Sequence, residues 1–113
     1  MNFELYVITD ETITSGRSHA EIAEQALRGG ADVIQLRDKG RSCAELAGIG
    51  REIAAIIQKA GAVFIVNDRL DVAIACGADG VHLGQDDMRL STARQLTPPG
   101  FIIGVSVGTL EEA

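Results

Sequence analysis

Short apolar runs recur along the chain and predict five β-strands. The runs are too short for helices, and most of them lack the polar alternation of a strand with one solvated face. Continuous apolar runs of this kind are typical of strands that are covered on both faces, as in parallel sheets. They lie at residues 5–8, 33–36, 63–66, 81–83 and 101–105.

Helical patterns lie between these runs. Ser18 with Glu21, and Ser42 with Glu45, have the spacing of a capping box, in which each side chain satisfies an exposed backbone donor of the other residue. The second box opens the clearest helix, which Gly61 is expected to end. Shorter helices are predicted at residues 71–76 and 90–96. The apolar residues of the clearest helix recur at steps of three and four, at Leu46, Ile49, Ile53, Ile56, Ile57 and Ala60.

The alternation of strands and helices predicts a parallel α/β sheet, either doubly wound or closed into a TIM (β/α)8 barrel. Gly-Ala-Asp occurs at residues 30–32 and again at 77–79, and both times it ends a helix and enters a strand. A repeat in step is expected of a barrel, whose strands are geometrically equivalent. The glycine pattern G-x-G-x-x-G of dinucleotide-binding sheets does not follow the first strand. We therefore predict a TIM barrel.

The length fits only part of such a barrel. A complete barrel needs about 250 residues, whereas this chain has 113. We interpret residues 1–113 as a single incomplete TIM-barrel domain, a half-barrel with strands 1 to 5 and about the first four and a half βα units. Thr109 and Glu112 form another capping box just before the final Ala113. Five strands alone would leave both sheet edges and one helix-facing surface uncovered, so we expect a homo-oligomer, a missing C-terminal half or an incomplete chain.

Composition narrows the class of partner. The net charge of −6 argues against nonspecific binding of nucleic acid and against attraction to an anionic membrane. Cys43 and Cys76 lack metal-ligand spacing and are interpreted as buried thiols in a reducing compartment. The chain shows neither a basic-then-apolar leader nor an apolar run of the roughly 20 residues that cross a bilayer. We therefore expect a cytoplasmic protein that binds small molecules.

The end of the second predicted strand carries the strongest chemical signal. Gln35, Arg37 and Lys39 alternate along the chain, so an amide and two cations are expected on one face. Two buried cations need an anionic partner, because leaving them unpaired would cost several kcal/mol, roughly. The partner is either a bound phosphate or an internal carboxylate, and Asp68 and Asp87 are the candidates for a structural ion pair.

Polar residues also follow the other predicted strands, where TIM barrels place their active sites. They are Thr9 and Asp10, Asn67 and Asp68, residues 85–87, and Ser106. Carboxylates from two neighbouring loops suit Mg²⁺, which completes its shell with water and phosphate oxygens. Asp87 also has the position of a helix cap, and both roles are compatible. His82 is interpreted either as a packing histidine or as an acid or base, and Arg69, Asp71 and Arg94 as surface charges or helix ends.

Four motifs together resemble the thiamine-phosphate synthase family. They are QLRDK at residues 35–39, VNDR at 66–69, ADGVHLGQDDM at 78–88 and IGVS at 103–106. The resemblance implies a Mg²⁺-dependent transferase of thiamine biosynthesis that joins 4-amino-5-hydroxymethyl-2-methylpyrimidine diphosphate to 4-methyl-5-(2-phosphooxyethyl)thiazole and releases diphosphate. It also implies roles for individual residues: Gln35, Arg37, Lys39 and Asn67 hold the pyrimidine diphosphate, Asp68 and Asp87 bind Mg²⁺, and Ser106 contacts the pyrimidine or the diphosphate.

The implied chemistry gives Arg37 and Lys39 a catalytic role, because cations stabilise the charge that grows on a departing diphosphate. Gly108 stands where family members commonly have a histidine two residues after the serine. A thiazole tautomerase-like protein is disfavoured by Gly108 and by the intact pair of acids. An isomerase or aldolase barrel would need a base or a Schiff-base lysine, and only Lys39 and Lys59 exist. A noncatalytic half-barrel fragment or module is the alternative from another class.

Overall fold

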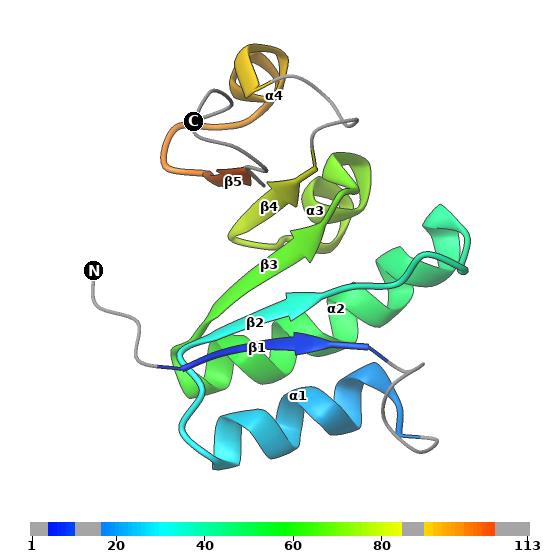
Figure 1. The fold of residues 1–113 in the computed structure, drawn as a ribbon, viewed down its shortest axis with the longest axis vertical. Coiled ribbons are helices and arrows are strands. Elements are labelled where there is room, and N and C mark those ends of the chain that lie inside the picture. Colours follow the sequence, from blue (N-terminus) through cyan, green and yellow to red (C-terminus); the bar gives the residue numbers. More distant parts are fainter. Residues whose placement is uncertain (1–4, 11–16, 85–89, 106–113) are drawn as a thin grey trace.

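The computed structural model describes residues 5–10, 17–84 and 90–105. Strands and helices alternate through this part of the chain (Figure 1). The elements are β1 (Tyr6–Thr9), α1 (His19–Arg28), β2 (Val33–Leu36), α2 (Cys43–Ala60), β3 (Val63–Asn67), α3 (Leu70–Cys76), β4 (Gly80–Leu83), α4 (Leu90–Leu96) and β5 (Ile102–Val105). The elements for which a range was predicted lie within a few residues of it, and α1 begins directly after Ser18 of the predicted cap.

The strand order confirms the barrel topology. The five strands form one parallel sheet in the order β1-β2-β3-β4-β5, so each strand pairs with the next one along the chain. The helices lie along one side of the curved sheet (Figure 1). A doubly wound sheet would reverse its strand order and carry helices on both faces. The described elements are therefore the first part of a (β/α)8 barrel, as predicted.

The core lies between the sheet and the helices. Parallel pairing sets Ile34 beside Phe64 and Leu36 beside Val66, and all four side chains are buried. Val81 of β4 pairs with Val66 and is also fully buried. The helix-facing side of the sheet is thus a continuous aliphatic and aromatic layer, which stabilises the fold through the hydrophobic effect.

The face of the sheet opposite the helices is the open one, which corrects the expectation that a helix-facing surface would be uncovered. Tyr6, Ile8 and Ile102 point to this inner face and are exposed. A shallow hollow of about 160 Å³ lies on it, lined by Tyr6, Val33, Val63, Ile65, His82, Ile102 and Gly104. In a closed barrel this face is the packed interior. Its covering by a second copy or by the other half of a barrel stays a prediction.

The Gly-Ala-Asp repeat has the same structural role in both places. Asp32 accepts a hydrogen bond from the Leu5 amide at 3.1 Å, and Asp79 accepts one from the Phe64 amide at 2.8 Å. Each aspartate therefore ties the start of its own strand to the start of the preceding strand. Gly30 and Gly77 both have positive φ, which glycine adopts without the strain of a side chain. The repeat reflects two equivalent βα units of one barrel.

The helix ends follow the predicted caps. Ser42 and Glu45 form a complete capping box at the start of α2, and Gly61 ends that helix in the left-handed region with φ of 72°. At α1 only half of the predicted box forms. The Ser18 side chain accepts a hydrogen bond from the Glu21 amide at 3.1 Å, while the Glu21 carboxylate accepts one from the Ser18 hydroxyl at 3.2 Å. The capping box predicted at Thr109 and Glu112 lies outside the described residues.

The two cysteines differ in their surroundings. Cys76 is buried, as expected, whereas Cys43 is only half-buried, so the prediction of two buried thiols is wrong for Cys43. The Cys43 thiol donates a hydrogen bond to the Asp71 carboxylate at 3.2 Å, and this contact raises the pKa of the thiol. In the described part of the chain, no helix combines the length and the apolar content needed to span a bilayer.

Helices α2 and α3 approach each other closely at Gly50. A β-carbon at Gly50 would lie 2.7 Å from the Cys76 sulfur, whereas a β-carbon at Gly48 of the same helix would meet nothing within 4 Å. Gly50→Ala is therefore expected to lower the free energy of unfolding by about 1–3 kcal/mol through overpacking. Gly48→Ala is expected to raise it by up to about 1 kcal/mol, because alanine favours a helix more than glycine does. Urea unfolding of both variants measures the difference, and equal effects would contradict the close approach.

Candidate functional site

The side-chain amides of Gln35 and Asn67, called here the amide row, lie on the inner face of the sheet toward the carboxyl ends of β2 and β3. Gln35 of β2 is buried. Its Nε2 donates a hydrogen bond to the Tyr6 hydroxyl at 2.6 Å, and its Oε1 accepts one from Asn67 Nδ2 at 2.8 Å. Gln35 and Asn67, both predicted to bind substrate, therefore contact each other directly. Tyr6 was not predicted, because the apolar run of the first strand does not show which of its side chains face the inner side.

Lys39 and Asp68 form an ion pair between the loop after β2 and the end of β3. The Lys39 side chain is 59% exposed, whereas that of Asp68 is 19% exposed. Asp68 has φ of 65°, and among the described residues it is the one non-glycine residue with positive φ. This conformation costs about 1–2 kcal/mol for most side chains, and strained backbone of this kind is concentrated at functional sites. The Asp68 amide donates to the His82 carbonyl at 2.7 Å, which holds the turn against β4.

Arg37 forms a second ion pair, toward β1. Its guanidinium lies 2.8 Å from the Asp10 carboxylate, and its side chain is 42% exposed. Strand β2 ends at Leu36, but the Arg37 amide still donates to the Thr9 carbonyl at 3.2 Å. The two cations therefore turn to opposite neighbours, Arg37 to the end of β1 and Lys39 to the end of β3.

The structural ion pair that was the alternative to a bound phosphate forms between Lys39 and Asp68. Arg37 pairs with Asp10, which was not among the predicted partners. In both pairs the cation is exposed and the carboxylate is half-buried. Pairs with a solvated partner contribute only about 0–1 kcal/mol to stability, because water already solvates the charge. Neither cation is enclosed in the protein interior. Both are accessible to a soluble anion, which can displace a carboxylate at little cost.

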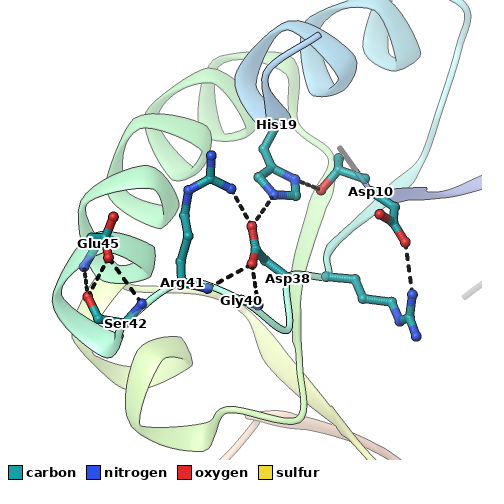
Figure 2. Close-up of polar contacts among 9 residues, drawn as sticks. Asp10, His19, Asp38, Gly40, Arg41, Ser42 and Glu45 are labelled. Atoms are coloured by element: carbon teal, nitrogen blue, oxygen red, sulfur yellow. Dashed lines mark hydrogen bonds and ion pairs between the residues drawn. The ribbon is translucent and has the colours of Figure 1, made fainter. Parts of the chain in front are cut away.

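Asp38, between the two cations, is the centre of a polar network (Figure 2). One carboxylate oxygen accepts from the backbone amides of Gly40 and Arg41 at 2.9 and 3.0 Å. The other accepts from His19 Nε2 at 2.9 Å and from the Arg41 guanidinium. Burial disfavours the charged form of Asp38, but the bonds from His19, the two amides and Arg41 outweigh it and hold the pKa of the carboxyl well below its usual range.

His19 joins this network to β1. Its Nδ1 lies 2.8 Å from the Thr9 hydroxyl, so Thr9, His19 and Asp38 form a line of hydrogen bonds. The order resembles that of a nucleophile, base and carboxylate. The Thr9 side chain, however, is fully buried on the helix side of the sheet, where no substrate reaches it. The expectation that Thr9 joins the polar cluster at the strand ends is therefore wrong, because its strand position points it toward α1.

The remaining predicted residues divide into placed and undescribed ones. His82 lies on the inner face, and its ring packs over Gly104, where a β-carbon would come within 2.7 Å of its Nδ1. Arg69 pairs with Asp71 at 3.1 Å and lowers the pKa of that carboxyl to about 2, while Arg94 donates to the Phe101 carbonyl. These contacts confirm the interpretation of Arg69, Asp71 and Arg94 as surface charges or helix ends. Asp87, Ser106, Gly108 and residues 85–86 lie outside the described residues.

The described residues include no group of three or more His, Cys, Asp and Glu side chains that could hold a metal ion. Such a cage is not what Mg²⁺ needs, because that ion usually takes one or two protein carboxylates and completes its shell with water and phosphate oxygens. The Asp68 carboxylate, at a strained turn beside the amide row, fits one such ligand.

The contact between Asp38 and His19 was not predicted from the sequence, because a single acid and a single histidine far apart in the chain give no spacing signal.

The sequence of the chain is similar to that of known proteins along its length. A family model described as thiamine monophosphate synthase matches residues 5–113. Thiamine-phosphate synthase of Methanoregula boonei is 66% identical over all 113 residues, which cover 52% of that relative. The same enzyme of Methanospirillum hungatei is 60% identical over the whole chain and 55% of its own length.

A solved structure agrees with these sequence matches. Thiamine phosphate pyrophosphorylase from Pyrococcus furiosus superimposes with a TM-score of 0.88 and is 42% identical, over 96% of this chain and 52% of that one. The chain therefore spans about half the length of the relatives it matches.

Proposed function

The chain belongs to the thiamine monophosphate synthase family, and from this premise we propose that it carries the pyrimidine-diphosphate half of a thiamine-phosphate synthase site. The reaction transfers the 4-amino-2-methylpyrimidin-5-ylmethyl group from its diphosphate to 4-methyl-5-(2-phosphooxyethyl)thiazole and releases diphosphate. We place this transferase in the cytoplasm, because its free cysteines fit a reducing compartment.

The observation that carries the proposal is the meeting of polar side chains at the carboxyl ends of β2 and β3. Gln35 bonds Asn67, and Lys39 pairs with Asp68, so an amide pair and an exposed cation lie on neighbouring strand ends. Arg37 adds a second exposed cation beside them. Exposed cations in an acidic protein suit a local anion site, because the chain as a whole does not attract phosphate.

We assign each residue a role in binding. Arg37 and Lys39 hold the diphosphate by charge-assisted hydrogen bonds. Gln35 and Asn67, whose amides already bond each other, present their remaining donors and acceptors to the pyrimidine diphosphate. Ser106 is proposed as a further contact to the pyrimidine or the diphosphate. Asp68 and Asp87 would hold Mg²⁺, which when bound neutralises charge on the diphosphate oxygens.

The chemistry needs no protein nucleophile. The bond between the pyrimidine methylene carbon and the diphosphate oxygen breaks, and the electron pair leaves with the oxygen. Arg37 and Lys39 lower the barrier, because they stabilise the charge that grows on the departing group. The thiazole nitrogen then forms the new bond to the methylene carbon. The buried position of Thr9 agrees with this scheme, because the Thr9–His19–Asp38 line cannot reach a substrate.

Isothermal titration of the 113-residue chain with the pyrimidine diphosphate and Mg²⁺ tests the proposal, followed by a coupling assay with the thiazole phosphate. We expect Mg²⁺-dependent binding of the pyrimidine diphosphate. In TIM barrels the phosphate cradle often follows strands 7 and 8, beyond the elements described here. We therefore expect the chain to bind the pyrimidine diphosphate more readily than it couples it to the thiazole phosphate. Binding without product would identify a noncatalytic half-barrel module, and absence of binding would refute the proposed site.

A further inference from the structure

The acid between the two cations has a role of its own in the loop that carries them. We infer that Asp38, held in place by His19, is a positioning residue that sets the loop of residues 37–41 so that Arg37 and Lys39 are presented to a diphosphate. This inference rests on the proposed function. Asp38 itself does not contact the substrate, and it acts through its two neighbours in the chain.

The loop lacks the support of regular structure. Strand β2 ends at Leu36 and helix α2 begins at Cys43, so Arg37 and Lys39 lie between the two elements. Asp38 replaces the missing support, because one of its oxygens accepts from the amides of Gly40 and Arg41 and closes a tight turn. The turn fixes the backbone on both sides of Lys39.

The second oxygen of Asp38 fixes the turn relative to the barrel. It accepts from His19 Nε2 at 2.9 Å, and the other ring nitrogen of His19 lies 2.8 Å from the Thr9 hydroxyl. The buried histidine therefore links two elements, because Thr9 belongs to β1 and Asp38 to the loop after β2. A buried polar group with both ends bonded is costly to displace, because each lost bond leaves an unsatisfied group.

Charge balance supports the same role. A carboxylate between Arg37 and Lys39 would weaken their attraction for an anion if its charge were free. Asp38 instead accepts hydrogen bonds from the Arg41 guanidinium, from His19 and from two backbone amides, so its charge is compensated within its own network. The field of the two exposed cations is thereby retained, and their backbone is ordered before the ligand arrives. Preorganisation of this kind raises affinity because less side-chain and loop freedom is lost on binding.

The test compares three variants with inorganic diphosphate and Mg²⁺ as the probe. Asp38→Asn weakens the bonds from the loop amides by removing the charge, and it turns an NH2 donor toward the donors of His19 and Arg41. His19→Gln changes a side chain on the helix side of the sheet, where it cannot touch the probe. Asp79→Asn is the matched control, because Asp79 also accepts a backbone amide, at the opposite ends of the strands. Calorimetry measures the Kd of diphosphate, and hydrogen exchange measures how fast the backbone amides of Gly40 and Arg41 exchange with solvent.

We expect the Kd to rise about tenfold in Asp38→Asn and in His19→Gln, with faster exchange at both amides, and to stay within about twofold in Asp79→Asn. In a Lys39→Ala background, Asp38→Asn is expected to have a smaller effect, because part of its action runs through Lys39. Unchanged affinity in both Asp38→Asn and His19→Gln would overturn the inference and leave the proposed function intact. Equal loss in Asp79→Asn would also overturn it, and an unsubstituted chain that binds no diphosphate would refute the proposed function itself.

Discussion

Lys39→Ala is expected to weaken Mg²⁺-dependent binding of the pyrimidine diphosphate about 10- to 100-fold, because a charge-assisted hydrogen bond to phosphate is worth about 1.5–3 kcal/mol. Turnover with both substrates is expected to fall further, by about 100-fold or more, since the same cation stabilises the leaving group most strongly in the transition state. The free energy of unfolding should change by no more than about 1 kcal/mol, because the Lys39 side chain is 59% exposed and water solvates its charge.

Lys59→Ala is the matched control, because Lys59 is the other lysine of the chain and lies in the last turn of α2. Titration calorimetry, the coupling assay and urea unfolding of both variants give the three quantities. Lys39→Ala with an unchanged rate of turnover would remove the leaving-group role. A loss of stability as large as the loss of binding energy would instead make the Lys39–Asp68 pair a structural one.

Asp68→Gly is expected to separate stability from function. Glycine adopts positive φ without the strain that Asp68 bears, which offsets the larger entropy that glycine gains on unfolding. The free energy of unfolding should therefore stay within about 1 kcal/mol of that of the unsubstituted chain. Mg²⁺-dependent diphosphate binding should weaken about 100-fold, because the proposed metal ligand is gone and loss even of its supporting bonds costs about 10- to 100-fold at metal sites.

The control for this prediction is Asp71→Gly, three residues further along the chain. Asp71 lies in the first turn of α3 and bonds Arg69, so glycine there removes a salt bridge and loosens a helix start. It should lower stability by about 1 kcal/mol and leave the Mg²⁺ dependence of binding unchanged. If Asp68→Gly binds diphosphate and Mg²⁺ normally, Asp68 is not a metal ligand and its strained turn has another cause.

Much of the fold was predictable because local signals agreed with the tertiary packing. The apolar runs that became β2 to β5 needed only small shifts of their ends, and the capping box at Ser42 and the stop at Gly61 bound α2 as predicted. The Gly-Ala-Asp repeat indicated equivalent units, and the sequential parallel sheet confirms them. Agreement between local preference and global fold is what a well-defined native state requires.

The candidate site was predictable only in part. Gln35 meets Asn67, and Lys39 meets Asp68, as the convergence of strand ends suggested. Thr9 was assigned to the wrong side, because a residue at a strand end was treated as free to face the site although the alternation of β1 directs it toward α1. The Arg37–Asp10 pair and the Asp38 network were not visible in the sequence. The roles of Asp87 and Ser106 stay predictions.

The sequence by itself determined the order of the elements, the approximate bounds of the strands and the types of side chain that gather at the strand ends. These properties depend on periodicity and on turn chemistry, which act over a few neighbouring residues. Only the tertiary structure decided which charge meets which, because His19, Asp38, Asp10 and Asp68 come together from separate βα units. Such contacts depend on strand register and loop conformation, and no local pattern encodes the distance between residues on different elements.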